Sequence, residues 1–173
     1  MIRTFLAVPL PLKVKKELGR EIDKIKTTLS DWQVNWVRPE NLHVTLIFFG
    51  WIPDGKVPLL QPEIRNALAG FPSFEISTGK LSAEKHPIWI EVKKGRGGLT
   101  RLHSNLNLQG YRKEKRSFSP HLTIGRVKRR GKLKLPKIEK TFLWKTNRLV
   151  LYESKISRKG PVYKELFSFD LIH

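Results

Sequence analysis

The sequence predicts an α+β fold of two pseudo-symmetric lobes, with mostly antiparallel sheets flanked by helices and a central active-site cleft. Two observations carry this prediction. The pattern His-x-Thr-x occurs twice, at His43-Val44-Thr45-Leu46 and at His121-Leu122-Thr123-Ile124, each time inside an apolar run. The tetrads lie 78 residues apart (121 minus 43), near half of the 173-residue chain, and each sits in a predicted strand after a predicted helix. Because no linker composition separates the halves, we expect residues 1–173 to form a single two-lobed domain.

The first 70 residues are predicted to contain three strands and two helices. Apolar residues recur at helical spacing in the first helix, with lysines and glutamates between them: Val14, Leu18, Ile22, Ile25 and Leu29. Gly70, followed by Phe71-Pro72, marks the end of the second helix. We expect strands at residues 3–9, 33–37 and 42–49, and helices at residues 11–29 and 56–69.

The rest of the chain, from residue 71 on, is predicted to be richer in strands. Gly110 ends its only predicted helix, at residues 97–109. Residues 129–140 contain Gly131 and Pro136 and are expected to form a basic loop. We expect strands at residues 74–78, 87–92, 120–127, 147–156 and 163–171.

In a strand, residues two apart point to the same face, so His43 shares a face with Thr45, and His121 shares one with Thr123. Alternation places Phe48 on the opposite, apolar face, where we expect it in the core. Either tetrad alone is more often structural than functional. The repetition favours a shared site, because the chain has only five histidines and two of them fall in matching tetrads.

Two imidazoles and two hydroxyls suit phosphoryl transfer. Histidine takes or gives a proton near neutral pH, and a reaction that activates a nucleophile and protonates a leaving oxygen needs one base and one acid. Threonine hydroxyls beside them can stabilise charge on the non-bridging oxygens. The residues alone do not say which histidine is the acid.

Charge is the strongest compositional signal. Lysine and arginine number 34 against 15 aspartates and glutamates, so the formal net charge is +19. A domain this basic generally meets a polyanion, so RNA or DNA is the expected partner; the alternative is a lysine-rich surface that serves solubility or heat resistance. Clustering around the second tetrad favours nucleic acid. The clustered residues are Lys113, Lys115, Arg116, Arg126, Lys128, Arg129, Arg130, Lys132 and Lys134.

Other features narrow the class of protein. The chain has no cysteine, which excludes disulfides and thiolate metal sites and fits a cytoplasmic protein. No apolar run approaches the ~20 residues of a membrane span, and we interpret the first nine residues as a strand rather than a secretory signal. The remaining histidines, at 86, 103 and 173, show no zinc-ligand spacing. Gly95-Arg96-Gly97-Gly98 lacks the context of a P-loop, so we predict a turn there.

Two segments resemble the motifs of the RNA 2′,3′-cyclic phosphodiesterase (2′-5′ RNA ligase) family of the two-histidine phosphoesterases. The first is Trp36-Val37-Arg38-Pro39-Glu40-Asn41-Leu42-His43-Val44-Thr45-Leu46 with Phe48-Phe49-Gly50. The second is Phe118-Ser119-Pro120-His121-Leu122-Thr123-Ile124-Gly125-Arg126. The opening Arg3-Thr4-Phe5-Leu6-Ala7-Val8 and the tail Leu149-Val150-Leu151-Tyr152-Glu153-Ser154 with Val162-Tyr163 are also similar. The resemblance spans essentially the whole chain.

The resemblance implies metal-independent hydrolysis of RNA 2′,3′-cyclic phosphate ends to 2′-phosphate, with no cofactor. By the family pattern, His43 is the proton donor to the leaving 3′ oxygen and His121 is the proton acceptor that activates water. Thr45, Thr123 and Arg126 would bind the phosphate. The family also joins RNA halves through a 2′-5′ linkage, but we expect hydrolysis first because the water route needs no energy source. The implied partners are RNA with a cyclic phosphate end or a cyclic nucleotide, and nothing requires more than a monomer.

Several points stay open. Strict alternation puts Arg126 on the face opposite His121, unless a bulge or bend at Gly125 re-aims it. The segment 128–140 is short and basic where the family pattern leads us to expect a helix. Among the aromatic residues, Phe5, Trp36, Phe48 and Tyr152 are candidates to stack on a base, but each fits the core as well. The alternative functions are a non-catalytic binding module for a nucleotide or RNA end, and a phosphodiesterase for 2′-5′ oligoadenylate or a small cyclic ester.

Overall fold

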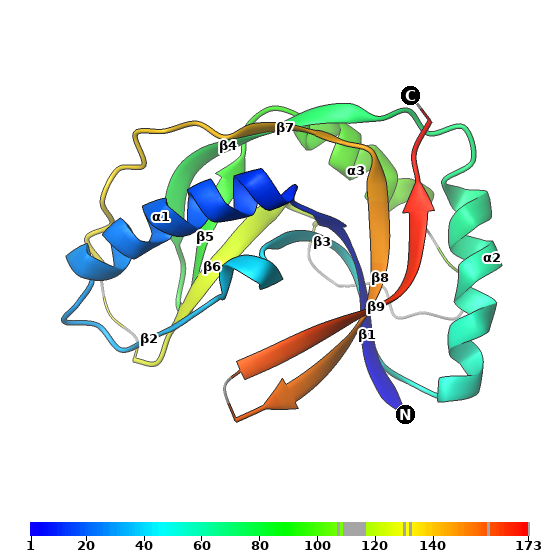
Figure 1. The fold of residues 1–173 in the computed structure, drawn as a ribbon, viewed down its shortest axis with the longest axis horizontal. Helices are drawn as coiled ribbons and strands as arrows, with labels where there is room; N and C mark the ends of the chain where they lie inside the picture. The colour runs from blue at the N-terminus through cyan, green and yellow to red at the C-terminus, as the bar shows by residue number, and fades with distance from the viewer. Residues whose placement is uncertain (107, 109–116, 130, 132, 159, 173) are drawn as a thin grey trace.

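The computed structural model describes residues 1–106, 108, 117–129, 131, 133–158 and 160–172. Its centre is a strongly curled sheet of nine strands with three α-helices packed around it (Figure 1). The strands follow the order β7-β4-β5-β6-β3-β1-β8-β9, and β2 pairs with β6 beside this path. All of these strand pairs are antiparallel. The α+β prediction with mostly antiparallel strands is therefore confirmed.

The elements fall close to their predicted positions. The strands are β1 (Ile2–Pro9), β2 (Val34–Trp36), β3 (His43–Ile52), β4 (Phe74–Ala83), β5 (Pro87–Val92), β6 (His121–Val127), β7 (Leu143–Thr146), β8 (Arg148–Ser157) and β9 (Gly160–Asp170). The helices are α1 (Leu12–Thr28), α2 (Val57–Ala67) and α3 (Arg96–Asn105), with two short 3-10 turns, η1 (Pro39–Asn41) and η2 (Asp54–Lys56).

Two halves of the sheet are organised alike. One half has the order β3-β1-β8-β9 and the other β6-β5-β4-β7. A helix connects the two inner strands of each half, α1 between β1 and β3, and α3 between β5 and β6. Between β3 and β6, the halves meet at the pairing of Val44 with Leu122. The predicted lobes are therefore halves of one sheet, joined at the two tetrads.

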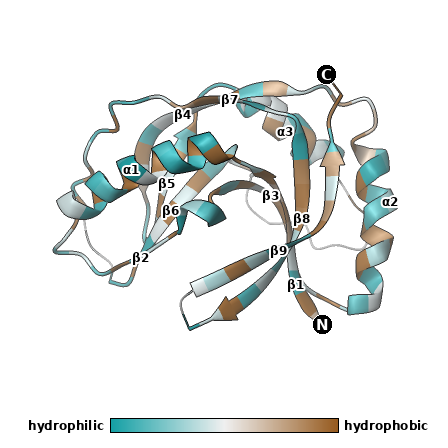
Figure 2. Ribbon diagram, viewed as in Figure 1, coloured by the Kyte–Doolittle hydropathy of each residue, from teal (hydrophilic) through white to brown (hydrophobic). Residues whose placement is uncertain are grey.

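The apolar core explains why the helices form where they do. Helix α1 buries Leu18, Ile22 and Ile25 at helical spacing, and α2 buries Leu60 and Ile64. These side chains join one large apolar cluster with the inward residues of the strands. Figure 2 shows hydrophilic and hydrophobic residues alternating along both helices, which is the pattern of a helix with one face on a core.

Four local features need comment. Strand β7 was not predicted; it is a four-residue edge strand that pairs only with β4 in the described chain. The turn predicted at Gly95–Gly98 is correct only for Gly95, which has the left-handed φ of +83°. The prediction is wrong for the next three residues, because helix α3 begins at Arg96. The predicted helix 97–109 ends earlier, at Asn105, and residues 107 and 109 lie outside the described residues. In the segment 128–140, the described residues form neither helix nor strand, as the loop prediction has it.

Candidate active site

The two tetrads cross each other at the middle of the sheet. Because Val44 pairs with Leu122 in an antiparallel register, His43 lies beside Thr123 and Thr45 lies beside His121. Val44 and Leu122 are fully buried in the core, so the residues on either side of them point to the other face of the sheet. The structure thus brings both histidines and both threonines onto one face, as predicted.

A β-bulge follows each tetrad and reverses the alternation. In β3, Thr45 pairs with Ala7 but Ile47 pairs with Leu6, so Leu46 is the extra residue. The prediction that Phe48 lies in the core is therefore wrong: the bulge turns its side chain to the face that carries Thr45, where it is 48% exposed.

Arg126 is re-aimed in the same way. In β6, Thr123 pairs with Trp89 but Gly125 pairs with Ile88, so Ile124 is the extra residue. The carbonyl oxygen of Ile124 accepts a hydrogen bond from the backbone N–H of Val37 (2.9 Å), which satisfies the polar group that the bulge removes from the ladder. Arg126 consequently lines the same cavity as Thr123.

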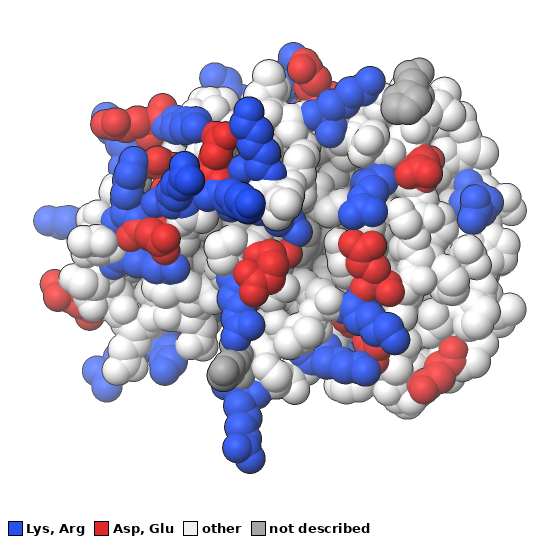
Figure 3. Space-filling view, in the orientation of Figure 1, with Lys and Arg blue, Asp and Glu red and all other residues white. Residues whose placement is uncertain are grey.

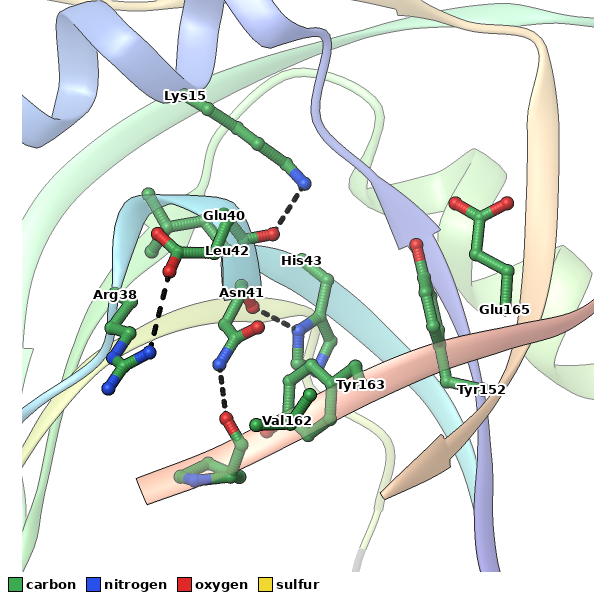
Figure 4. A pocket seen from close by; sticks show the side chains of 11 residues that line it. Lys15, Arg38, Glu40, Asn41, Leu42, His43, Tyr152, Val162, Tyr163 and Glu165 are labelled. Carbon is green, nitrogen blue, oxygen red and sulfur yellow. Dashed lines mark hydrogen bonds and ion pairs between the residues drawn. The ribbon is translucent and has the colours of Figure 1, made fainter. Parts of the chain in front are cut away.

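His43 is held in one orientation by hydrogen bonds on both ring nitrogens. Its Nδ1–H donates to the carbonyl oxygen of Asn41 (2.6 Å), since a carbonyl can only accept (Figure 4). Its Nε2 lies 3.0 Å from the Thr45 hydroxyl. The ring also contacts Phe5 and Tyr163, with centroids 4.9 and 5.4 Å away. Burial is the main cause that lowers the pKa of His43 to about 4; the charges of Lys15 and His121 act in the same direction, and the hydrogen bond to Asn41 opposes them.

His121 repeats this arrangement in a more open setting. Its Nδ1–H donates to the carbonyl oxygen of Ser119 (2.7 Å), two residues earlier, as His43 does to Asn41. Its ring lies edge-on to Trp89 of the neighbouring strand (5.9 Å). The side chain is exposed. In both histidines Nε2 is therefore the nitrogen that can exchange a proton on the open face.

The open face is hollowed into a cavity of about 720 Å³. Four of the predicted site residues line it, namely His43, Thr45, Thr123 and Arg126. His121 does not belong to its lining and lies exposed beside it. The other walls come from β2, the 3-10 turn η1 and the β8–β9 hairpin. Figure 1 shows this hairpin projecting below α1 at the lower edge of the view.

Several lining residues were not predicted. Asn41 is buried, and its side-chain N–H donates to the carbonyl oxygen of Pro161 in β9 (2.7 Å), so it ties the hairpin to the turn that orients His43. Tyr163 packs against His43, and its pKa is raised by burial. Arg158 lines the cavity from the hairpin. Asn41 and Tyr163 belong to the quoted motifs, but only the fold shows that they meet.

The basic residues gather unevenly on the surface. Figure 3 shows lysines and arginines concentrated over the half of the visible face that carries α1. Of the cluster predicted around the second tetrad, Arg126 lines the cavity. Lys113, Lys115, Arg116, Arg130 and Lys132 lie outside the described residues.

The remaining described histidines have structural partners. His103 stacks on Phe118 (4.3 Å, 5° between ring planes), and its Nδ1 bonds the Leu46 carbonyl oxygen. The Nδ1 of His86 bonds the Val127 carbonyl oxygen (3.0 Å). Within the described chain, no group of three histidine, aspartate or glutamate side chains is placed to hold a metal ion, and no helix is long and apolar enough to cross a membrane.

Comparison with known proteins shows which family the sequence matches. A model of the 2′-5′ RNA ligase superfamily matches residues 14–155. An RNA 2′,3′-cyclic phosphodiesterase of Methanothermobacter thermautotrophicus is 33% identical, over 98% of this chain and 99% of that protein. The Archaeoglobus fulgidus protein of the same name is 32% identical, over 98% and 100%.

Solved structures share the fold. The apo form of E. coli LigT matches with a TM-score of 0.85 at 22% identity, over 99% of this chain and 98% of that one. The fold and the site define an α+β protein in which two His-x-Thr-x tetrads cross on one face of a curled antiparallel sheet. Within that class, the chain belongs to the 2′-5′ RNA ligase superfamily.

Proposed function

We propose that this protein hydrolyses 2′,3′-cyclic phosphate ends of RNA to 2′-phosphate ends by two-histidine acid–base catalysis. The observation that carries the proposal is the crossing of the tetrads, which presents two oriented imidazoles on one face beside a cavity. Two relatives with at least 32% identity over nearly their whole length are named RNA 2′,3′-cyclic phosphodiesterase, which supports the same activity here.

The proposed step is an in-line displacement at phosphorus. Water attacks on the side of His121, whose Nε2 takes the water proton. The bond between phosphorus and O3′ breaks, and the Nε2 of His43 gives its proton to O3′. The products are a 2′-phosphomonoester and a free 3′-hydroxyl. The exposure of His121 supports its role as the base, because water can reach its ring; His43 is half-buried and serves as the acid.

The remaining residues stabilise the phosphate and the base. Thr45 and Thr123 donate hydroxyl hydrogen bonds to the non-bridging oxygens, where negative charge develops. The planar guanidinium of Arg126 donates paired hydrogen bonds to phosphate oxygens. Phe48, exposed in the same cavity, offers its ring face to the nucleobase of the terminal nucleotide.

Charging His43 is part of this proposal. Burial holds its pKa near 4, so the free protein carries a neutral His43 at pH 7. A phosphodiester in the cavity brings a negative charge close to the ring, and a nearby opposite charge favours the protonated form. Substrate binding therefore favours protonation of His43, which later donates this proton to O3′.

A metal-free assay separates the candidate functions. The protein is incubated in EDTA with a short RNA that ends in a 2′,3′-cyclic phosphate, and the end is identified by phosphorus NMR. Opening to the 2′-phosphate supports the proposal; binding without product means that the chain is a binding module. Parallel reactions with 2′-5′ oligoadenylate, and with a second RNA bearing a 5′-hydroxyl, show whether another ester is preferred and whether 2′-5′ joining occurs.

The setting of this activity is also part of the proposal. We propose a monomer that acts on RNA in the cytoplasm, as the positive charge and the absence of cysteine suggest. Sedimentation of the purified protein checks the monomeric state, and a dimer would contradict it.

A further inference from the structure

A second, smaller cavity also borders His43. It has a volume of about 220 Å³ and shares Arg38, Asn41, His43, Pro161 and Tyr163 with the larger cavity. Figure 4 shows Lys15 of α1 reaching into it from one side and Tyr152 and Glu165 lying on the other. The volume is below the ~300 Å³ at which sites for drug-sized ligands begin, so it suits a single phosphate group with its ester carbons.

Lys15 is held over this cavity by close packing of α1. One turn further along the helix, a Cβ added at Gly19 would lie 3.1 Å from the side chain of Pro39 in the 3-10 turn η1. Because Gly19 has no side chain, α1 can pack closely against this turn. The Lys15 ammonium then donates to the carbonyl oxygen of Glu40 in that turn (2.7 Å). The side chain is half-buried, and burial lowers its pKa, which means that its charge is poorly solvated.

The two carboxylates of the lining each have an arginine partner. Glu40 lies 3.8 Å from Arg38, and Glu165 lies 3.3 Å from Arg148. Lys15, by contrast, has no carboxylate within salt-bridge distance among the residues that the structure describes. Glu165 and Glu40 attract Lys15 only from beyond salt-bridge distance. The ammonium therefore has no direct carboxylate partner, which favours an anion.

The direction of the proposed reaction indicates which anion can reach Lys15. In the proposed function His43 protonates O3′, so the smaller cavity, which is lined by His43 and not by His121, lies on the ribose side of the reacting phosphate. The nucleophile enters from the opposite, His121 side. The ribose carries the rest of the RNA on its 5′ oxygen, and the first anion met there is the phosphodiester to the preceding nucleotide.

We propose that the smaller cavity binds this phosphodiester through Lys15, so that the protein prefers a polynucleotide end to a cyclic mononucleotide. The proposal rests on the proposed function, which supplies the direction of the chain. Lys15 is a binding residue here and takes no part in the proton transfers.

The test compares two substrates that share the same reacting group. A 2′,3′-cyclic mononucleotide lacks the upstream phosphodiester, and a dinucleotide with the same cyclic end contains it. We expect the wild-type kcat/KM to be higher for the dinucleotide, and Lys15→Gln to lower the ratio of the two values by about 10-fold or more, the scale of a lost charge-assisted hydrogen bond. Any effect of Lys15 on the pKa of His43 acts on both substrates and cancels in the ratio.

Three controls sharpen the result. Lys16→Gln removes the same charge from the adjacent, exposed position of α1 and should leave the ratio unchanged. A dinucleotide with a neutral methylphosphonate in place of the upstream phosphodiester should be hydrolysed no better than the mononucleotide, and Lys15→Gln should then have no further effect on the ratio. Lys15→Arg should keep most of the preference.

Each contrary outcome has a distinct meaning. If Lys16→Gln lowers the ratio as much as Lys15→Gln, the preference reflects diffuse surface charge and the cavity proposal is wrong. An unchanged ratio in Lys15→Gln also overturns it. If the wild-type protein opens neither substrate, the proposed function itself fails.

Discussion

Phe48 and Arg126 occupy equivalent places in the two halves of the sheet. Each lies five residues after the histidine of its tetrad and two residues beyond the extra residue of a bulge, Leu46 or Ile124. Both side chains consequently reach the same cavity. The pseudo-symmetry therefore ends in two different chemistries, an aromatic ring on one side and a guanidinium on the other, which suits a ligand with a base at one end and a phosphate at the other.

Replacing Phe48 tests the aromatic side of this pair. Stacking of a base on an aromatic ring is worth about 1–3 kcal/mol, so Phe48→Ala should weaken binding of a 2′-mononucleotide product by about 5- to 150-fold in calorimetry. Trp51→Ala is the matched control, because Trp51 lies on the same strand, is 62% exposed and does not line the cavity. Equal losses in both variants would mean that Phe48 has no special contact with the base.

Removing either imidazole of the tetrads should abolish most turnover. General acid and general base catalysis each contribute about 10²–10⁴-fold, so His43→Ala and His121→Ala should each lower kcat on a cyclic-phosphate RNA by at least about 100-fold. His86→Gln, a histidine away from the cavity, serves as the control and should stay within about twofold of wild type. A near-normal rate in either tetrad variant would contradict the assignment of acid and base.

The low pKa of His43 has a consequence for stability. Folding lowers this pKa from 6.5 to about 4, so the unfolded chain binds more protons between these values. The stabilisation by neutral His43 is complete above pH 6.5 and is lost as the pH falls toward 4. The free energy of unfolding should therefore fall by about 2 kcal/mol more in wild type than in His43→Gln between pH 7.5 and 5.0. Urea titrations at the two pH values measure this difference. An equal loss of unfolding free energy in both proteins would show that folding does not lower the pKa of His43.

Salt dependence tests the role of the basic surface. With a net charge of +19, the protein should release counterions from RNA on binding, so the logarithm of its affinity for RNA should fall steeply with the logarithm of the salt concentration. A cyclic mononucleotide, with one phosphate, should show a much smaller slope. Fluorescence anisotropy with a labelled RNA from 50 to 300 mM salt, roughly the range in which such slopes are measured, checks this. A flat response would mean that the basic surface does not meet the substrate.

Local patterns were sufficient for the centre of the site. His43, Thr45, His121 and Thr123 could be placed on common faces from the alternation of a strand alone, and the helical spacing of α1 and α2 could be read in the same way. Phe48 could not, because a bulge depends on the register of the neighbouring strand. Arg126 was left open for the same reason.

Long-range contacts were beyond reach of the sequence. The bond from Asn41 to Pro161 joins residues 120 positions apart, and no local pattern indicates it. Lys15 looks like any other lysine of an amphipathic helix until the packing of α1 on Pro39 places it over a cavity. Strand β7 was missed because so short an edge strand is defined by its pairing with β4 more than by its own residues.

The account depends most on both imidazoles meeting one phosphate, and a crystal structure with a bound 2′-mononucleotide tests this most directly. We predict the Nε2 of His121 within hydrogen-bond distance of a phosphate oxygen and the Nε2 of His43 within the same distance of the ribose 3′ oxygen. A phosphate that contacts only one of the rings, or that binds away from both, would contradict it.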